Sequence, residues 1–285
     1  MKKTEILKRI EQKERAGDFN THVQPNNSHV KKITPKYDYL RRGFFNQLGS
    51  GLSLPIFSFA GWLFSKTVHL KVEGKENLKL VKGQGCILTT NHINNIDCTL
   101  IKHITTGRRT YYTVADFNNY YGLFGAMLRA CGTLPFSESP KCMRNLMRAI
   151  ETLLEKKKMI VFYPEGALWW CYEKPRPVMP GAYYYASKFN VPIVPGFFTF
   201  KDLKKRKDGT AKKQFIFHIG KPIYPKAELS LKENIEYLSK ANFDFNKQIY
   251  ESFYNRPLEY LTEQSFNNNT EQAENTTTTT IKQEQ

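Results

Sequence analysis

The sequence contains few cysteines, and they do not form a metal-binding pattern. Only five of its 285 residues are cysteine, and no two of them form a CxxC pair. An odd number of scattered cysteines does not fit a disulfide framework, and no zinc signature is present. We therefore expect reduced thiols, a cytosolic setting and no metal site.

Acidic residues are scarce as well. The chain has 26 Asp and Glu against 43 Lys and Arg, a formal net charge of +17. An anionic membrane surface, a phosphorylated or CoA-like substrate and nucleic acid all fit that sign, as does a soluble protein whose lysines only keep it in solution. The basic residues are scattered and show no zinc-finger, RNP or helix-turn-helix pattern, so a nucleic-acid-binding protein is only a distant alternative.

Charge is absent altogether from Gly43 to Ser65. This segment is as long as a membrane span, but polar residues and Pro55 interrupt it. For residues 43–66 we predict a membrane-associating pair of helices, lying in the interface or shallowly inserted, with the preceding basic cluster against anionic headgroups. A helix hairpin packed on the protein's own core is the second possibility, and a single spanning helix is the third. The basic cluster comprises Lys31, Lys32, Lys36, Arg41 and Arg42.

The rest of the chain divides by composition. Residues 1–42 form a basic, polar N-terminal arm, and its first 15 residues are too charged for a secretory signal peptide. Residues 263–285 are rich in Asn, Thr and Gln and are expected to be a disordered tail. Between them, residues 67–262 alternate strand-like and helix-like segments, which predicts a single α/β domain with a mixed, mostly parallel central sheet flanked by helices. The expected strands are residues 68–72, 86–90, 110–114, 159–163, 191–199 and 214–219, and the expected helices are 139–158, 230–239 and 243–261.

The most informative residues are His92 and Asp97, which directly follow the predicted strand of residues 86–90. In open α/β sheets, ligands bind at the carboxyl ends of the strands. Histidine suits general-base chemistry near neutral pH, and a carboxylate on its second ring nitrogen fixes its tautomer and orientation. A turn leading into a helix at about Asp97 would bring the carboxylate back to the imidazole.

Four segments in order resemble the glycerolipid acyltransferase family, which includes the 1-acylglycerol-3-phosphate acyltransferases. Asn91-His92 followed by Asp97 matches the family's NHx4D motif, and residues 132–136 fall where its second motif lies. Residues 163–166, Tyr-Pro-Glu-Gly, are similar to its FPEG motif, and residues 191–195, Val-Pro-Ile-Val-Pro, to its apolar fourth motif. The combination at these intervals is a strong signal, and it covers roughly residues 68–200.

This resemblance implies a role for each motif residue. His92 would take the proton of an acceptor hydroxyl while Asp97 holds the imidazole, and the hydroxyl oxygen would attack an acyl thioester. Backbone N–H groups near Gly166 or at a helix start would stabilise the thioester oxygen. Glu165 would help to bind the acceptor glycerol. The predicted substrate-binding residues are Asn91, Glu165, Gly166, Lys174 and Arg176.

Two departures from the family bear on the acceptor. The family has Thr-Arg after its Pro-Glu-Gly, whereas this chain has Ala167 and Leu168, and the basic residue that ends the second motif is missing. Those arginines are thought to hold the acceptor's phosphate, a task suited to the guanidinium fork. Lys174 and Arg176 are the nearest replacements in sequence, with Lys141 and Arg144 as the second choice.

The resemblance therefore implies a membrane-associated O-acyltransferase of phospholipid synthesis. It would move a fatty acyl group from acyl-CoA or acyl-ACP to a lysophospholipid, most simply 1-acylglycerol 3-phosphate, and form phosphatidic acid. The same chemistry on another lysolipid or glycolipid is the close alternative. We expect no cofactor beyond the thioester co-substrate, and a peripheral or monotopic location on the cytosolic face of a membrane.

Overall fold

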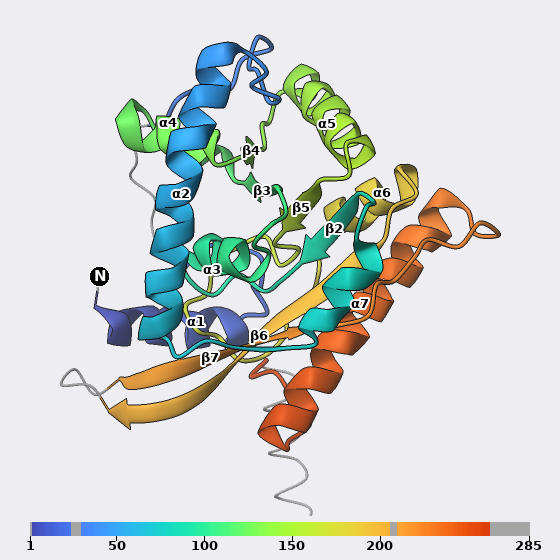
Figure 1. Ribbon diagram of the computed structural model, residues 1–285. Coiled ribbons are helices and arrows are strands. Elements are labelled where there is room, and N and C mark those ends of the chain that lie inside the picture. The colour runs from blue at the N-terminus through green and yellow to red at the C-terminus, as the bar shows by residue number, and fades with distance from the viewer. Residues whose placement is uncertain (1, 24–29, 206–209, 263–285) are drawn as a thin grey trace, which may run out of the picture.

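The fold is built on a seven-stranded sheet, seen in a computed structural model that describes residues 2–23, 30–205 and 210–262 (Figure 1). The strand order is β1-β7-β6-β2-β5-β3-β4. β6 and β7 pair antiparallel, and all other neighbouring pairs are parallel. The predicted mixed, mostly parallel sheet is thus confirmed. The strands are β1 Lys71–Glu73, β2 Cys86–Thr89, β3 Thr110–Val114, β4 Thr133–Pro135, β5 Met159–Phe162, β6 Ile193–Lys205 and β7 Ala211–Ile219.

Helices cover both faces of this sheet. Cys86 and Leu88 of β2 pack with α3 on one face, whereas Ile87 between them packs with α5, α6 and α7 on the other. Side chains alternate between the two faces of a strand, so a strand buried on both sides reads as a continuous apolar run. The helices are α1 Lys3–Arg15, α2 Phe44–Thr67, α3 Asp97–Ile104, α4 Gly122–Ala130, α5 Pro140–Glu155, α6 Gly181–Lys188 and α7 Leu231–Tyr254, with short 3₁₀ helices η1 Lys75–Val81 and η2 Asp116–Asn118.

The predicted N-terminal apolar segment is helical, but the prediction of two helices is wrong, because α2 is one continuous helix with Pro55 inside it. By length and composition, this 24-residue helix could cross a membrane. Gly61 is buried and brings α2 close to α3, since an added Cβ there would lie 2.2 Å from the Thr99 carbonyl oxygen. Most of the large apolar side chains of α2 face outward: Phe44, Phe45, Leu48, Leu52, Ile56, Phe59, Trp62 and Leu63.

The two helices expected at residues 230–239 and 243–261 are also a single helix, α7. It begins with a capping box formed by Ser230 and Glu233 and ends before Asn255, which has a left-handed backbone conformation. Asn242, which lies between the two expected helices, is buried and hydrogen-bonded to Thr89 at the end of β2. A polar residue in this position therefore packs the helix on the sheet rather than interrupting it.

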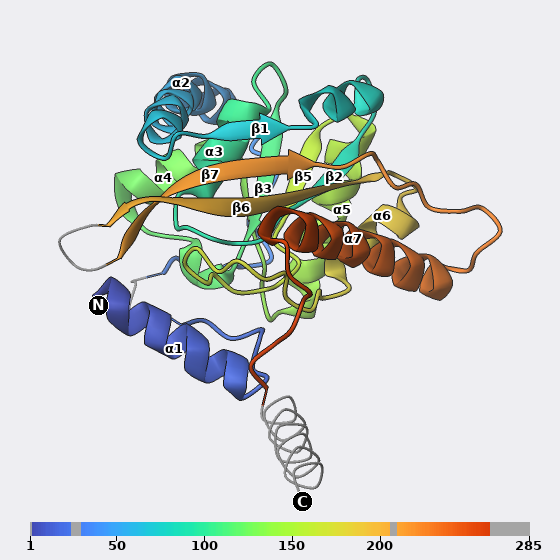
Figure 2. The same ribbon diagram turned by 90° about the horizontal axis from the view of Figure 1, so that it is seen from below.

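The N-terminal arm packs against the domain and does not extend freely from it. Ile6 and Ile10 of α1, together with Phe19 and Val23, form a cluster of buried side chains with Ala167 and Trp169. Figure 2 shows α1 below the sheet, on the side of the loops that follow β5. The predicted tail of residues 263–285 lies outside the described residues.

Adding a methyl group at the contact between α2 and α3 should destabilise the fold. We predict that Gly61→Ala lowers the free energy of unfolding by about 1–3 kcal/mol, because α2 must move away from the α3 backbone. Gly49→Ala is the matched control on the same helix, where an added Cβ meets no atom within 4 Å. It should be neutral or stabilising by up to about 1 kcal/mol, since alanine favours a helix over glycine. Chemical denaturation of both variants distinguishes these outcomes, and equal effects would contradict the close contact.

Candidate active site

The candidate site begins where β2 ends, at the loop that carries Asn91 and His92. Asn91 is buried, its amide nitrogen donates to the Phe198 carbonyl oxygen at 3.1 Å, and its amide oxygen accepts from the Phe198 N–H at 2.8 Å. Both ends of the amide are therefore bound to the backbone of β6. In this arrangement Asn91 anchors the loop that carries His92 and does not present its amide to a substrate, contrary to the predicted binding role.

His92 and Asp97 form a hydrogen-bonded pair, as their spacing predicted. Nδ1 of His92 lies 2.9 Å from Oδ2 of Asp97, and the same oxygen accepts from the N–H groups of Ile93 at 3.1 Å and Asn94 at 3.3 Å. Asp97 is 1% exposed and is the first residue of α3, where the helix dipole favours a negative charge. These contacts fix the carboxylate beside the imidazole ring and leave Nε2 of the half-buried His92 available to accept a proton.

Tyr163, at the end of β5, is a third member of this group that the sequence analysis did not single out. Its hydroxyl donates to Oδ1 of Asp97 at 2.8 Å, and its ring centroid lies 4.2 Å from that of His92. Burial, followed by the nearby Asp97 charge, raises the pKa of Tyr163 well above its ordinary value, so the phenol remains a donor. A tyrosine in place of the family's usual phenylalanine was the signal in the sequence.

The loop after β5 closes on the His92 loop through backbone hydrogen bonds. The N–H of Trp169 donates to the His92 carbonyl oxygen at 3.0 Å, and the N–H of Cys171 donates to that of Ile93, also at 3.0 Å. The first and third sequence motifs thus lie side by side at the carboxyl ends of β2 and β5. A proton-accepting histidine held by a buried carboxylate at this edge can activate a substrate hydroxyl.

Glu165 and Arg176 form a buried ion pair rather than two separate contacts to a substrate. The Arg176 guanidinium donates to Oε2 of Glu165 through Nε at 3.0 Å and Nη2 at 2.6 Å, and the Arg176 N–H donates to Oε1 at 3.1 Å. Arg176 is fully buried, and its guanidinium also donates to the carbonyl oxygens of Phe19 and Ala167. The prediction that Arg176 replaces a phosphate-binding arginine is therefore not supported, because all of these donors are already engaged.

Lys174 is paired with the N-terminal arm. Its Nζ lies 2.5 Å from Oε1 of Glu14, a carboxylate that also accepts from the N–H of Leu261 at 3.0 Å. Glu14 is 3% exposed, so this contact is mostly shielded from water. Like Arg176, Lys174 is part of the packing between the arm and the domain, and it does not reach toward His92 as a free cation.

Gly166 forms the turn after β5. Its φ is +77°, and an added Cβ would lie 2.7 Å from Sδ of Met179, so a larger residue would be strained here. Its N–H donates to the Tyr163 carbonyl oxygen at 3.0 Å. This N–H is therefore not free to stabilise a thioester oxygen. In this structure Gly166 forms the turn, and its predicted role in binding a substrate is not supported.

The N-terminal arm reaches the neighbourhood of the catalytic pair. The indole nitrogen of Trp169 donates to the Thr21 carbonyl oxygen at 3.0 Å. Burial lowers the pKa of the neighbouring His22, and electrostatic interaction with His92 and Arg176 lowers it further. The arm thus borders the site that residues 91–97 and 163–171 form.

Comparison with known proteins agrees with these features. Residues 69–199 match the family described as Acyltransferase. Among solved structures, the chain is similar to the 1-acyl-sn-glycerophosphate (LPA) acyltransferase PlsC from Thermotoga maritima, with a TM-score of 0.54 and 16% identity over 78% of this chain and 87% of that one. At this identity the likeness shows a shared fold. The search of curated proteins found no match.

A double-mutant cycle tests the ion pair. We predict that Arg176→Ala lowers the free energy of unfolding by about 3–5 kcal/mol, since it leaves the buried Glu165 carboxylate without a counter-charge. Adding Glu165→Gln to this variant should recover part of the loss. Urea denaturation of both single variants and the double variant gives the coupling free energy. Strictly additive losses would show that the two side chains do not depend on each other.

Proposed function

We propose that this chain is a member of the glycerolipid acyltransferase family and transfers a fatty acyl group from a thioester to the free hydroxyl of a lysophospholipid. The match of residues 69–199 to the Acyltransferase family supports this proposal. The observation that carries the proposal is the His92–Asp97 pair at the carboxyl end of β2. The domain and the fold support the reaction class, and the site geometry supports the roles of the residues.

The reaction needs one base and no nucleophile from the protein. Nε2 of His92 takes the proton of the acceptor hydroxyl, whose oxygen attacks the carbonyl carbon of the thioester. The C–S bond breaks, and the departing thiolate takes the proton back from the imidazolium. Asp97 stabilises the imidazolium in between, and the Tyr163 hydroxyl holds the carboxylate in position.

The first acceptor to test is 1-acylglycerol 3-phosphate, which would yield phosphatidic acid, with acyl-CoA or acyl-ACP as the donor.

A second acceptor class, a lysolipid or glycolipid without a phosphate monoester, is favoured by one observation. Lys174 and Arg176 are engaged with Glu14 and Glu165 and are not available to a phosphate. The second choice for holding a phosphate is Lys141 and Arg144. Both are exposed at the start of α5, on the same edge of the sheet as His92.

A membrane-associated location fits the apolar surface of the protein. Phe44 and Phe45 at the start of α2 are 76% and 84% exposed, and Leu123 of the neighbouring α4 is 79% exposed. Exposed apolar side chains on adjacent helices are a surface that a lipid interface covers. We propose peripheral or monotopic association with the cytosolic face of a membrane.

Replacing His92 by asparagine tests whether it is the general base, and the same replacement at His69 is the control. We predict that His92→Asn lowers kcat for acyl transfer by roughly 10²–10⁴-fold, the usual contribution of a general base. His69→Asn, at an exposed position beyond α2, should leave kcat unchanged. Steady-state rates with a labelled acyl-CoA, and in parallel with acyl-ACP, measure both. Wild-type rates for the His92 variant would remove this residue from the mechanism.

An acceptor panel separates the two acceptor classes. We expect lysophosphatidate to be acylated in a reaction that His92→Asn abolishes. If lysophosphatidate is not consumed while a lysolipid without a phosphate monoester is acylated in a His92-dependent manner, the second acceptor class is correct. Acylation of neither class with either donor would contradict the proposed function.

A further inference from the structure

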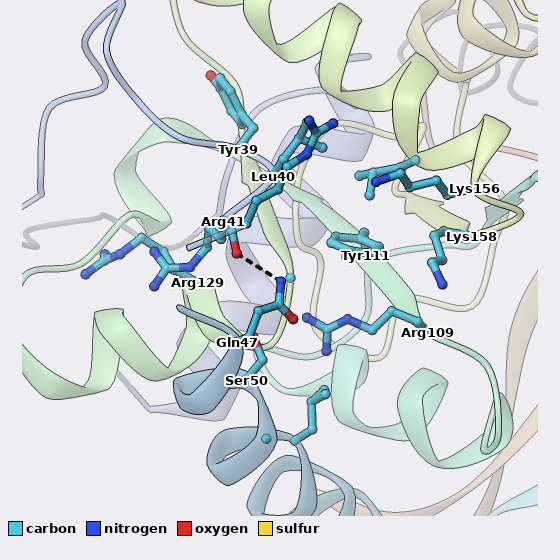
Figure 3. Close-up of a pocket in the computed structure, with 15 residues that line it drawn as sticks. Tyr39, Leu40, Arg41, Gln47, Ser50, Arg109, Tyr111, Arg129, Lys156 and Lys158 are labelled. Atoms are coloured by element: carbon cyan, nitrogen blue, oxygen red, sulfur yellow. Dashed lines mark hydrogen bonds between the residues drawn. The ribbon is translucent and has the colours of Figure 1, made fainter. Parts of the chain in front are cut away.

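A second candidate binding site lies in a basic cavity between the first half of α2, the start of β3 and the end of α5 (Figure 3). Its volume is about 510 Å³, within the range of small-molecule binding sites. In Figure 3, Arg41 and Arg129 lie on one side of the cavity and Arg109, Lys156 and Lys158 on the other. The basic side chains that line it are Arg41, Arg42, Arg109, Arg129, Lys156 and Lys158.

This cavity is separate from the candidate active site. Arg109 and Lys158 directly precede the parallel strands β3 and β5, whereas His92 and Tyr163 follow β2 and β5. The cavity therefore lies at the opposite edge of the sheet. The five residue-to-residue steps from Lys158 to Tyr163 span roughly 16 Å at the rise of a β-strand.

The positive charge of the cavity is not neutralised by the protein. No Asp or Glu lines it, and within residues 2–23, 30–205 and 210–262 none of its six cations forms an ion pair. Asp38 is close in sequence, but its Oδ1 accepts from the backbone N–H groups of Leu40 and Arg41. Like charges gathered in one cavity repel each other, so an anion bound between them would be stabilised.

Two arginines of the cavity also have unused hydrogen-bond donors. Nε of Arg41 and Nη1 of Arg109 are buried and have no partner among the described residues. A buried donor without a partner is unfavourable, and a phosphate oxygen is the partner that a guanidinium fork fits best. Burial lowers the pKa of Arg129; the nearby Tyr37 works against this shift, and the charge of Arg41 adds to it.

The position of the cavity on α2 indicates the source of the anion. Gln47, Ser50 and Leu54 line the cavity. In the same turns of α2, Phe45 and Leu52 are exposed. A ligand with an anionic group and apolar chains would match both surfaces, because the basic cavity and the apolar face share one helix.

We propose that this cavity binds the phosphate group of an anionic glycerophospholipid, whose acyl chains lie along the exposed apolar face of α2. This site holds a membrane lipid rather than a reactant, and it orients α2 on an anionic bilayer. The proposal does not depend on the proposed acyl transfer, since it rests on the cavity and on α2 alone.

Vesicle co-sedimentation of the full chain tests the site. The vesicles are phosphatidylcholine alone or phosphatidylcholine with phosphatidylglycerol, which is neither substrate nor product of the proposed reaction. Arg109→Gln/Lys158→Gln removes two charges from the cavity. Lys221→Gln/Lys232→Gln is the matched control, because it removes two exposed charges before and within α7, which lies away from α2 in both ribbon views (Figures 1 and 2).

We expect the cavity variant to bind phosphatidylglycerol vesicles about tenfold more weakly than wild type, and the control variant to stay within about twofold. Binding to phosphatidylcholine alone should be unchanged for both, which also shows that the cavity variant is folded. Lys156→Gln, at an exposed position on the rim, should weaken binding in the same direction. Equal losses for the cavity and control variants would mean attraction by general surface charge and would overturn the proposal.

Soluble sources of phosphate are distinguished by competition. Inorganic phosphate and free CoA are added at constant ionic strength to the vesicle assay and to a thermal unfolding assay. The proposal predicts that neither displaces wild-type protein from phosphatidylglycerol vesicles. Stabilisation by phosphate or CoA that the cavity variant loses, together with unchanged vesicle binding of that variant, would assign the cavity to a soluble phosphate and overturn the lipid proposal.

Discussion

The candidate site depends on the hydrogen bonds that the Asp97 carboxylate accepts. It accepts hydrogen bonds from the imidazole of His92, from the backbone N–H groups of Ile93 and Asn94, and from the hydroxyl of Tyr163. These donors come from the loop after β2 and from the end of β5, and the carboxylate itself starts α3. Burying a carboxylate is unfavourable unless such donors surround it, so the positions of the loop after β2, the end of β5 and the start of α3 depend on one another.

Other polar side chains at this edge of the sheet are also engaged within the protein. Asn91 joins the catalytic loop to β6, Arg176 joins Glu165 to the backbone of the arm, and Lys174 joins the loop after β5 to Glu14. Such contacts give the loops a defined position, because a buried ion or amide tolerates few alternative arrangements. They also show that polar residues near a motif can be engaged within the protein, as Lys174 and Arg176 are.

The parts of the fold that the sequence predicted are those with local signals. Strand β2 reads as an apolar run buried on both faces, α5 has one apolar face behind Pro140, and the spacing of His92 and Asp97 fits a strand, a turn and a helix start. The errors arose where a polar or helix-breaking residue lies in a packed element, as with Pro55 in α2 and Asn242 in α7. The arm and its ion pairs were missed because Glu14 and Lys174 are 160 residues apart, and no local pattern joins them.

The packing of the N-terminal arm has a consequence for how the protein is made. The carbonyl of Thr21 and the indole of Trp169 that binds it are 148 residues apart, and Glu14 contacts the N–H of Leu261, 247 residues later. At about 5–20 residues per second, the ribosome synthesises Trp169 roughly 7–30 s after Thr21. During that time the apolar side chains of Ile6, Ile10 and Phe19 lack Ala167 and Trp169, the residues of the domain on which they pack. The arm reaches its place only after the loop that follows β5 has been made, so the border of the active site is among the last features of the fold to form during synthesis.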